Sequence, residues 1–236
     1  MSVSVIIPTT GVSELRNSIE SVLNQSINTQ CYVVCDGLNY KGKVSTIVSD
    51  YLGNPNLKVC YLPENVGANG FYGHRTYAAF THLVNSDYVL YLDPDNWFNP
   101  DHVKTCIDTI ESNNLDWCYS LRKIHDKDGQ YLCDDDCESL GKWPTFQEGN
   151  LIDTSCYAMK TSVAIKISHV WHCGWGADRL FANTIMQYFP KFQCTGEYTT
   201  SYRLDGNTGS VTREFFDYGN NIMNDKYNGI FPWQKS

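Results

Sequence analysis

The hydrophobic pattern of the chain alternates between short apolar runs and stretches with helical spacing. Residues 2–8 form a β-branched run typical of a buried strand, and residues 14–24 then repeat apolar side chains every three or four positions, which predicts a helix. Further strands are expected at 31–35, 57–62 and 88–92, and further helices at 42–51, 73–84 and 100–112. Strands that alternate with helices indicate an α/β fold with a parallel sheet.

The pattern becomes richer in strands after residue 112. Strands are expected at 117–124 and 152–159, with a hairpin turn at Asp128-Gly129 and an acidic, irregular segment at 133–148. Beyond these we expect a short helix at 161–169, a helix at 179–188, a strand at 202–204 and a polar, Asn-rich tail. Because no Ser/Gly-rich linker interrupts the chain, we expect one domain over residues 1–236.

Composition narrows the class of protein. The net charge is −8, whereas nucleic acids and acidic membranes are bound by clustered Lys and Arg, so we expect no nucleic-acid partner. The first ten residues contain neither a basic stretch nor a long apolar run, so we expect no signal peptide and no integral membrane segment. The ten cysteines include no C-x-x-C pair, which argues against structural zinc and for reduced thiols in a cytoplasmic protein.

Three groups of candidate residues follow expected parallel strands. Pro8-Thr9 ends the first strand, Asp36 follows the second, and Asp93-Pro94-Asp95 follows the strand at 88–92. In an open α/β sheet, ligands bind beyond the carboxyl ends of the strands. The topology therefore predicts that these residues meet at one edge of the sheet.

Asp93 and Asp95 are two carboxylates one residue apart at the end of a buried strand. Such a pair is costly to bury unless a cation or hydrogen bonds compensate its charge. Mg²⁺ or Mn²⁺ commonly binds one or two protein carboxylates together with phosphate oxygens, which suits a nucleoside diphosphate. Asp-Pro-Asp-Asn is also favourable turn chemistry, so spacing alone leaves both interpretations open.

Over roughly its first 205 residues, the chain resembles the family 2 glycosyltransferases of the GT-A fold. The motifs that carry the resemblance, in order, are Val3–Thr9, Asp36, Glu64-Asn65-Val66-Gly67, Gly73-His74-Arg75 and Asp93-Pro94-Asp95. The resemblance implies a mostly parallel sheet flanked by helices, with a β-rich acceptor side. It divides the domain into a nucleotide-sugar-binding half at about 1–98, an acceptor half at about 99–205 and a tail at about 206–236.

The resemblance also implies roles for individual residues. Asp93 and Asp95 match the family's Asp-x-Asp motif, with Asp95 as a metal ligand and Asp93 contacting the ribose beside the metal. The remaining residues that it assigns to the nucleotide-sugar site are Pro8, Thr9, Asp36, Asn65 and Arg75. His74 and Thr76 depart from the family pattern. The alternative to a role for Arg75 in the nucleotide site is that it is a cation on the surface of a helix.

Gly176-Ala177-Asp178 resembles the place where the family carries two acids before a late helix. The second acid often removes the proton of the acceptor hydroxyl, so Asp178 is the candidate general base, although Ala177 replaces the first acid. The alternative is that Asp178 only caps the helix. Trp175 is a candidate for stacking on the sugar of the nucleotide-sugar, with core packing as the alternative.

Near the expected last strand, the family often carries Tyr-Arg followed by a His. This chain has Tyr202-Arg203-Leu204-Asp205 instead, so Asp205 is a candidate metal ligand, with Asn207 an alternative oxygen donor, and Arg203 could meet phosphate. Three further groups contain His or Asp side chains, but we assign no metal to them. A lone His more often satisfies a local hydrogen bond, and we interpret the run of three Asp residues as a solvated loop. The three groups are His74, the pair His169 and His172, and Asp134–Asp136.

Together with these motifs, the resemblance implies a metal-dependent, inverting glycosyltransferase that moves a sugar from a UDP-sugar to a saccharide or other hydroxyl acceptor, with Mn²⁺ or Mg²⁺ as cofactor. GDP and dTDP are the alternative nucleotides. A non-catalytic nucleotide-sugar or carbohydrate-binding relative is the first alternative, because Ala177 replaces an acid. A metal-dependent phosphatase of the haloacid dehalogenase class also uses Asp-x-Asp, but normally after its first strand, where this chain has Pro8-Thr9.

Overall fold

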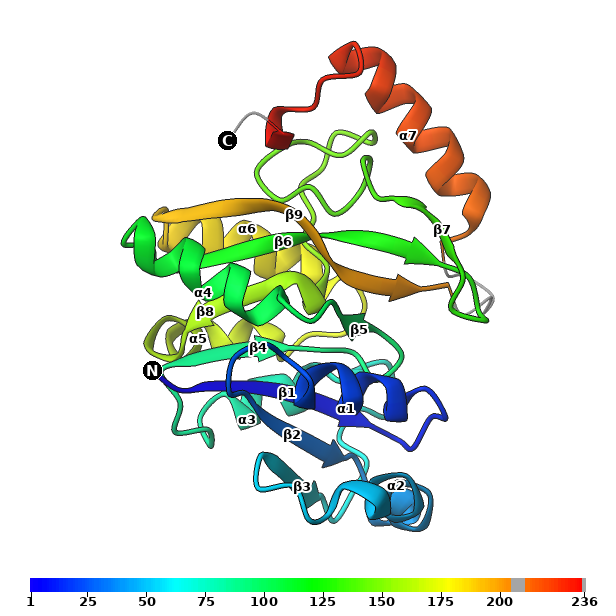
Figure 1. Ribbon diagram of the computed structural model, residues 1–236, viewed down its shortest axis with the longest axis vertical. Helices are drawn as coiled ribbons and strands as arrows, with labels where there is room; N and C mark the ends of the chain where they lie inside the picture. The colour runs from blue at the N-terminus through cyan, green and yellow to red at the C-terminus, as the bar shows by residue number, and fades with distance from the viewer. Residues whose placement is uncertain (205–210, 235–236) are drawn as a thin grey trace.

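A nine-stranded sheet organises the computed structural model, which describes residues 1–204 and 211–234 (Figure 1). Its strand order is β3-β2-β1-β4-β8-β6-β9-β5, and β7 pairs with β6. The strands are β1 (Val3–Thr9), β2 (Gln30–Cys35), β3 (Leu57–Tyr61), β4 (Tyr88–Tyr91), β5 (Trp97–Phe98), β6 (Trp117–His125), β7 (Tyr131–Asp134), β8 (Tyr157–Lys160) and β9 (Phe192–Arg203). The expected α/β architecture is confirmed.

The first four strands form the parallel part of the sheet, with β1 in its middle between β2 and β4. Side chains alternate across β1, so that Val5 and Ile7 face one hydrophobic core and Ile6 the other. The helices over the first core are α1 (Leu15–Leu23), α2 (Lys41–Val48) and α4 (His102–Ser112). Those over the second core are α3 (His74–Phe80), α5 (Thr161–Ile167) and α6 (Ala177–Tyr188).

The second half of the sheet is mixed. β8 pairs antiparallel with both β4 and β6, whereas β6 and β9 run parallel over most of their length. The predicted turn at Asp128-Gly129 is confirmed: it connects β6 to β7, with Gly129 at φ +80° and its amide donating to Asp126 O at 2.9 Å. The sheet thus continues from the parallel half into a strand-rich half.

Several element boundaries differ from the expectation, most of all in the second half of the chain. The strand expected at 152–159 begins only at Tyr157, because Asp153 Oδ1 accepts the amide of Ser155 and starts a 3₁₀ turn at Thr154–Cys156. The helix expected at 161–169 ends at Ile167 and continues as a 3₁₀ turn, Ser168–Trp171. The strand expected at 202–204 is the end of the much longer β9.

The expectation of a tail without secondary structure is wrong. Helix α7 spans Arg213–Tyr227 and begins where Thr212 Oγ1 accepts the amide of Phe215 at 3.4 Å. It buries Phe216 and Met223 and lies against the segment 133–149 at the top of Figure 1. Among the described helices, α7 included, none is both long and apolar enough to cross a membrane.

The interpretation of Asp134–Asp136 as a solvated loop is also wrong. Asp135 is fully buried and accepts from Arg122 Nε at 2.7 Å. Asp136 accepts from the Tyr198 hydroxyl, and burial raises its pKa to about 6. The acidic run therefore belongs to the interior of the strand-rich half. The ten cysteines all lie within the described ranges and are free thiols.

Candidate functional site

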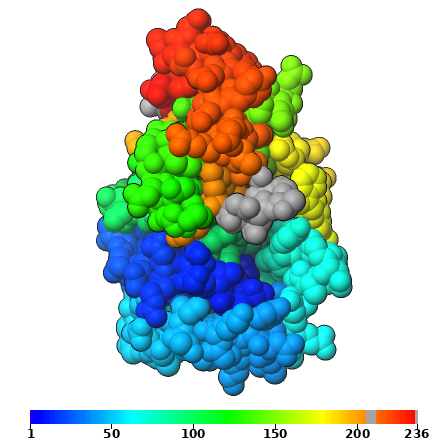
Figure 2. Space-filling model, turned by 90° about the vertical axis from the view of Figure 1, so that its right-hand side faces the viewer, coloured from blue at the N-terminus to red at the C-terminus, as the bar shows by residue number. Residues whose placement is uncertain are grey.

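A cleft of about 890 Å³ opens at the carboxyl ends of the parallel strands. Figure 2 views the molecule from this side, with residues of the first half of the chain in blue and cyan below and α7 in orange above. The structure brings most of the candidate residues together here. Those lining the cleft are Pro8, Thr9, Asp36, Asn65, Asp93, Asp95, Trp175 and Asp178.

Two described candidate residues, Arg75 and Arg203, are not among the residues that line the cleft. The guanidinium of Arg75 lies 3.3 Å from the ring centroid of Phe71, and its Nη1 donates to Val66 O at 3.3 Å. Arg75 is therefore neither a free surface cation nor directed at the cleft; it braces the loop at 65–71. Asp205 lies outside the described residues, as does Asn207.

Asp36 organises the loop that follows β3. Its two carboxylate oxygens accept the amides of Val66 and Gly67 at 2.7 and 2.8 Å. The close approach requires a glycine, since a Cβ on Gly67 would lie 2.7 Å from Asp36 Oδ2 and 2.0 Å from Tyr72 O. Asp36 thereby joins β2 to the loop that carries Asn65.

Asn65 presents a polar atom without a protein partner. Its Nδ2 donates to the Tyr40 hydroxyl at 3.4 Å, whereas its Oδ1 is buried and has no hydrogen-bond partner among the described residues. A buried carbonyl oxygen without a donor is costly, and native structures usually supply one. The side chain lines the cleft and can therefore accept a hydrogen bond from a ligand.

The Asp93–Asp95 turn is anchored from two sides. Ser18 of α1 is fully buried, and its hydroxyl lies 2.9 Å from Pro94 O and 2.6 Å from Asn96 O. On the other side, Ser155 Oγ accepts from the backbone amide of Asp93 and from Asn96 Nδ2. The turn is thus a fixed part of the site.

The carboxylates of the cleft interact electrostatically. Burial, with Asp153 and Asp95 nearby, raises the pKa of Asp93 to about 8, although the Tyr77 hydroxyl donates to its Oδ1 at 2.8 Å. Burial also raises the pKa of Asp178, opposed by the amide of Arg179, which donates to its Oδ1 at 2.8 Å. Both carboxyls therefore favour their protonated forms, and a cation bound beside them would favour their ionised forms.

Asp178 and Trp175 lie at the start of α6. The residue that caps this helix is Gly176, at φ +84°, and Asp178 occupies the first turn at the cleft, so the interpretation of Asp178 as the cap is wrong. Trp175 is 85% exposed, which overturns the alternative of core packing. Ala177, by contrast, is fully buried in the aromatic core.

Arg122 is a residue of the site that the sequence analysis missed. Its guanidinium pairs with Asp135, Glu138 and Asp153 at 2.7, 2.5 and 2.6 Å and stacks 4.4 Å from the ring centroid of Tyr202. Arg122, Glu138 and Asp153 all line the cleft. The available signal was a single Arg inside an apolar strand, since a buried Arg needs carboxylate partners.

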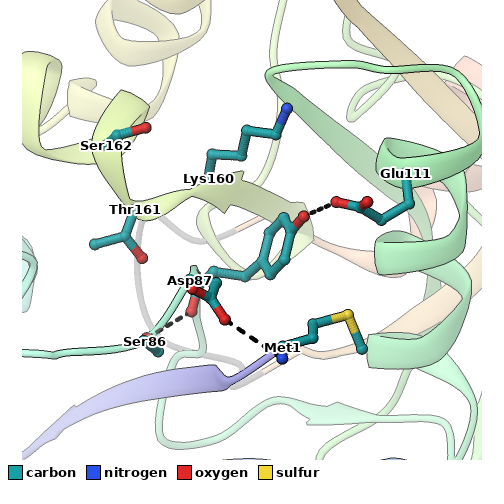
Figure 3. Close-up of a pocket in the computed structure, with 8 residues that line it drawn as sticks. Met1, Ser86, Asp87, Glu111, Lys160, Thr161 and Ser162 are labelled. Carbon is teal, nitrogen blue, oxygen red and sulfur yellow. Dashed lines mark hydrogen bonds and ion pairs between the residues drawn. The ribbon is translucent and has the colours of Figure 1, made fainter.

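A second hollow, of about 490 Å³, lies at the opposite ends of β1 and β4 (Figure 3). Its acidic groups are already paired within the protein. Asp87 binds the amide and hydroxyl of Ser2 and lies 3.7 Å from the N-terminal amine, and Tyr88 donates to Glu111. It contains none of the motif residues, so the cleft at the carboxyl ends is the candidate site.

Comparison with known proteins agrees with this geometry. The family described as "Glycosyl transferase family 2" matches residues 4–132, which include the loop at 65–71 and the Asp93–Asp95 turn. An uncharacterised protein of Haemophilus influenzae is 33% identical over 109 residues, which cover 39% of this chain and 74% of that protein. The family match thus extends over the half of the chain that carries the parallel strands.

Solved structures of S. aureus TarS have a similar fold. The TarS fragment 1–349 in complex with UDP-GlcNAc has a TM-score of 0.66 at 17% identity, covering all of this chain and 69% of the fragment. Another structure of the fragment has a TM-score of 0.63 at 18% identity, with 86% and 60% covered. A longer TarS structure has a TM-score of 0.61 at 15% identity, and this chain spans 44% of its length.

Proposed function

The chain belongs to glycosyl transferase family 2, and we propose on this premise that it transfers a sugar from a UDP-sugar to an acceptor hydroxyl, with inversion at the anomeric carbon. The observation that carries the proposal is the convergence in one cleft of Asp36, Asn65, the Asp93–Asp95 turn and Asp178. Binding of UDP-GlcNAc by the structurally similar TarS fragment supports a donor of the same class.

The buried Oδ1 of Asn65 supports uracil as the base. It has no partner among the described residues and can accept a hydrogen bond, and the N3–H of uracil is a donor. Cytosine has a bare acceptor at this ring position and would leave Asn65 Oδ1 unpaired. Asp36 holds the loop that positions Asn65, and Pro8 and Thr9 supply the neighbouring wall.

The residues present fit a divalent cation. Within residues 1–204 and 211–234, no group of three or more His, Cys, Asp or Glu side chains is arranged to hold a metal, so among the described residues we assign the ion to Asp93 and Asp95. One or two carboxylates completed by phosphate oxygens is the usual environment of Mg²⁺ or Mn²⁺ at a nucleotide. Burial, and then the nearby Asp153 and Asp95, raise the pKa of Asp93, and an ion bound beside it would favour the ionised carboxylate. The ion would stabilise charge on the departing diphosphate.

Asp178 is proposed as the general base. It lines the cleft from the first turn of α6, and burial raises its pKa, which makes its carboxylate a stronger proton acceptor. The acceptor oxygen loses its proton to Asp178 and bonds to the anomeric carbon while the bond to the diphosphate breaks. The buried position of Ala177 supports an enzyme over a binding relative, because an acid at 177 would point into the core.

The proposal can be tested with the purified protein and a panel of nucleotides. With Mn²⁺ present, we expect UDP to raise Tm more than GDP, dTDP or CDP, and one or more UDP-sugars to be hydrolysed slowly. Asn65→Ala should lose the preference for UDP over CDP, while Asn56→Ala, in an exposed turn outside the cleft, should keep it. Stabilisation by none of the nucleotides would refute the donor site.

A further inference from the structure

Trp175 lines the cleft with 85% of its surface exposed. Trp is highly buried on average, and ligand pockets are lined largely by aromatic side chains, so an exposed Trp that lines a cleft is a candidate contact for a ligand. An indole face suits the C–H face of a pyranose ring, which is apolar and flat.

The loop that carries Trp175 is held in place by packing contacts. His74 Nδ1 hydrogen-bonds Cys173 O at 3.0 Å, and a Cβ on Gly174 would lie 3.0 Å from Gly70 O, so the loop before α6 packs closely on the loop before α3. Trp171, just below, is fully buried and stacks on Phe181 at 4.1 Å. Trp175 is therefore exposed on a segment that these contacts hold in place.

The position of Trp175 relative to Asp178 assigns it to the acceptor side. The two residues flank the left-handed Gly176 at the start of α6, and both line the cleft. The base-side candidates, Asp36 and Asn65, lie on the loops after β2 and β3, and the second of these loops also carries Gly70, on which Gly174 packs. A ring that covers Trp175 would thus lie beside the proposed general base.

The charge around Asp178 restricts the acceptor further. The two guanidinium groups that line the cleft are both engaged, Arg122 by three carboxylates and Arg179 by Glu138 at 3.7 Å. Asp178 is a further acidic residue on the same wall, so the lining acids Glu138, Asp153 and Asp178 outnumber the two guanidinium groups. An acceptor with a phosphate or carboxylate would therefore meet net repulsion at this wall.

We propose that Trp175 is the platform for the acceptor and that the acceptor is an uncharged pyranoside. This inference rests on the proposed function and changes one of its expectations, because the sequence analysis predicts Trp175 at the sugar of the donor. Trp175 stacks on the acceptor ring, which presents a hydroxyl to Asp178, and the acidic wall excludes anionic sugars of the same shape.

Binding of matched glycosides to the protein in its complex with UDP and Mn²⁺ tests the inference. The neutral probes are methyl glycosides of glucose, galactose, mannose and N-acetylglucosamine, and the anionic ones are the methyl glycosides of glucuronic and galacturonic acid. Saturation-transfer NMR should detect a neutral glycoside bound about tenfold more tightly than its anionic counterpart. Trp175→Ala should weaken this binding about tenfold, equivalent to about 1.4 kcal/mol, and leave UDP affinity unchanged.

Tyr188→Ala is the matched control, because Tyr188 is 68% exposed at the far end of the same helix and is not among the residues of the cleft. It should bind glycosides as the wild type does. If UDP binds but no neutral glycoside does, or if uronides bind equally well, or if Trp175→Ala weakens UDP and not the glycoside, the inference is overturned while the proposed function stands. Failure of the wild type to bind UDP would instead contradict the proposed function.

Discussion

Arg122 Nη1 donates to Asp153 Oδ2 at 2.6 Å, and this ion pair joins the interior of β6 to the wall of the cleft. Three carboxylates share the one guanidinium, so its removal would leave buried negative charge without a partner. The pair should therefore stabilise this wall of the cleft.

We expect Arg122→Met to lower the free energy of unfolding by about 3–5 kcal/mol, the usual cost of breaking a buried ion pair from one side. Arg16→Met is the control, because the Arg16–Asp50 pair is exposed and should contribute less than about 1 kcal/mol. Urea unfolding of both variants measures the difference. Equal losses would show that the Arg122 cluster contributes no more than a surface pair.

Ser18→Ala removes the hydroxyl that bridges Pro94 O and Asn96 O beneath the Asp93–Asp95 turn. We expect a loss of about 1 kcal/mol of stability and a several-fold weaker Mn²⁺-dependent binding of UDP, because the turn is no longer held. Ser21→Ala is the matched control on the same helix, since Ser21 bonds only within α1. Calorimetric titration with UDP compares them, and an unchanged affinity in Ser18→Ala would refute the anchoring role.

Gly67→Ala should disrupt the loop that carries Asn65. The added methyl group would overlap Tyr72 O and Asp36 Oδ2, so the loop must move away from Asp36. We expect lower thermal stability and at least a tenfold loss of UDP affinity. Gly42→Ala, whose Cβ would meet nothing within 4 Å in helix α2, should keep UDP affinity and gain slightly in stability. Normal UDP binding by Gly67→Ala would contradict the role of this contact.

Asp178→Asn should lower kcat by about 10²–10⁴-fold, the range for loss of a general base, while UDP affinity stays within twofold. In the wild type, the base works only when deprotonated, and burial raises the pKa of Asp178 above that of an ordinary Asp. The rate should therefore fall as the pH is lowered through this raised pKa, and recover as the pH rises. A pH–rate profile measures it; a variant with wild-type turnover would remove Asp178 from this role.

The parallel half of the fold could be predicted because each of its strands is a short apolar run followed by a helical repeat. Helix α7 was missed because the apolar positions that it buries, such as Phe216 and Met223, are sparse within an Asn-rich sequence. β9 was mostly missed because Gly196 and polar residues interrupt its alternation, and its pairing with β6 shifts register. Tertiary contacts with β6 override its weak local pattern.

The edge of the sheet that carries the cleft was predictable from topology, since polar residues that follow parallel strands lie at one edge. The supporting contacts were not. Ser18 meets the Asp93–Asp95 turn across 76 residues of sequence, and Arg122 meets Asp153 across 31. The burial of Asp135 was missed for the same reason, because its partner Arg122 lies on another strand. Local composition carries no signal for such pairs.

Binding of UDP to the wild type and to Asp95→Ala, measured calorimetrically with Mn²⁺ and again with EDTA, tests the central claim most directly. The wild type should bind UDP with Mn²⁺ and at least tenfold more weakly with EDTA, whereas Asp95→Ala should show the weak binding in both conditions because the ion loses its protein ligand. Absence of UDP binding to the wild type in the presence of Mn²⁺ would contradict the claim that this cleft holds a nucleoside diphosphate sugar.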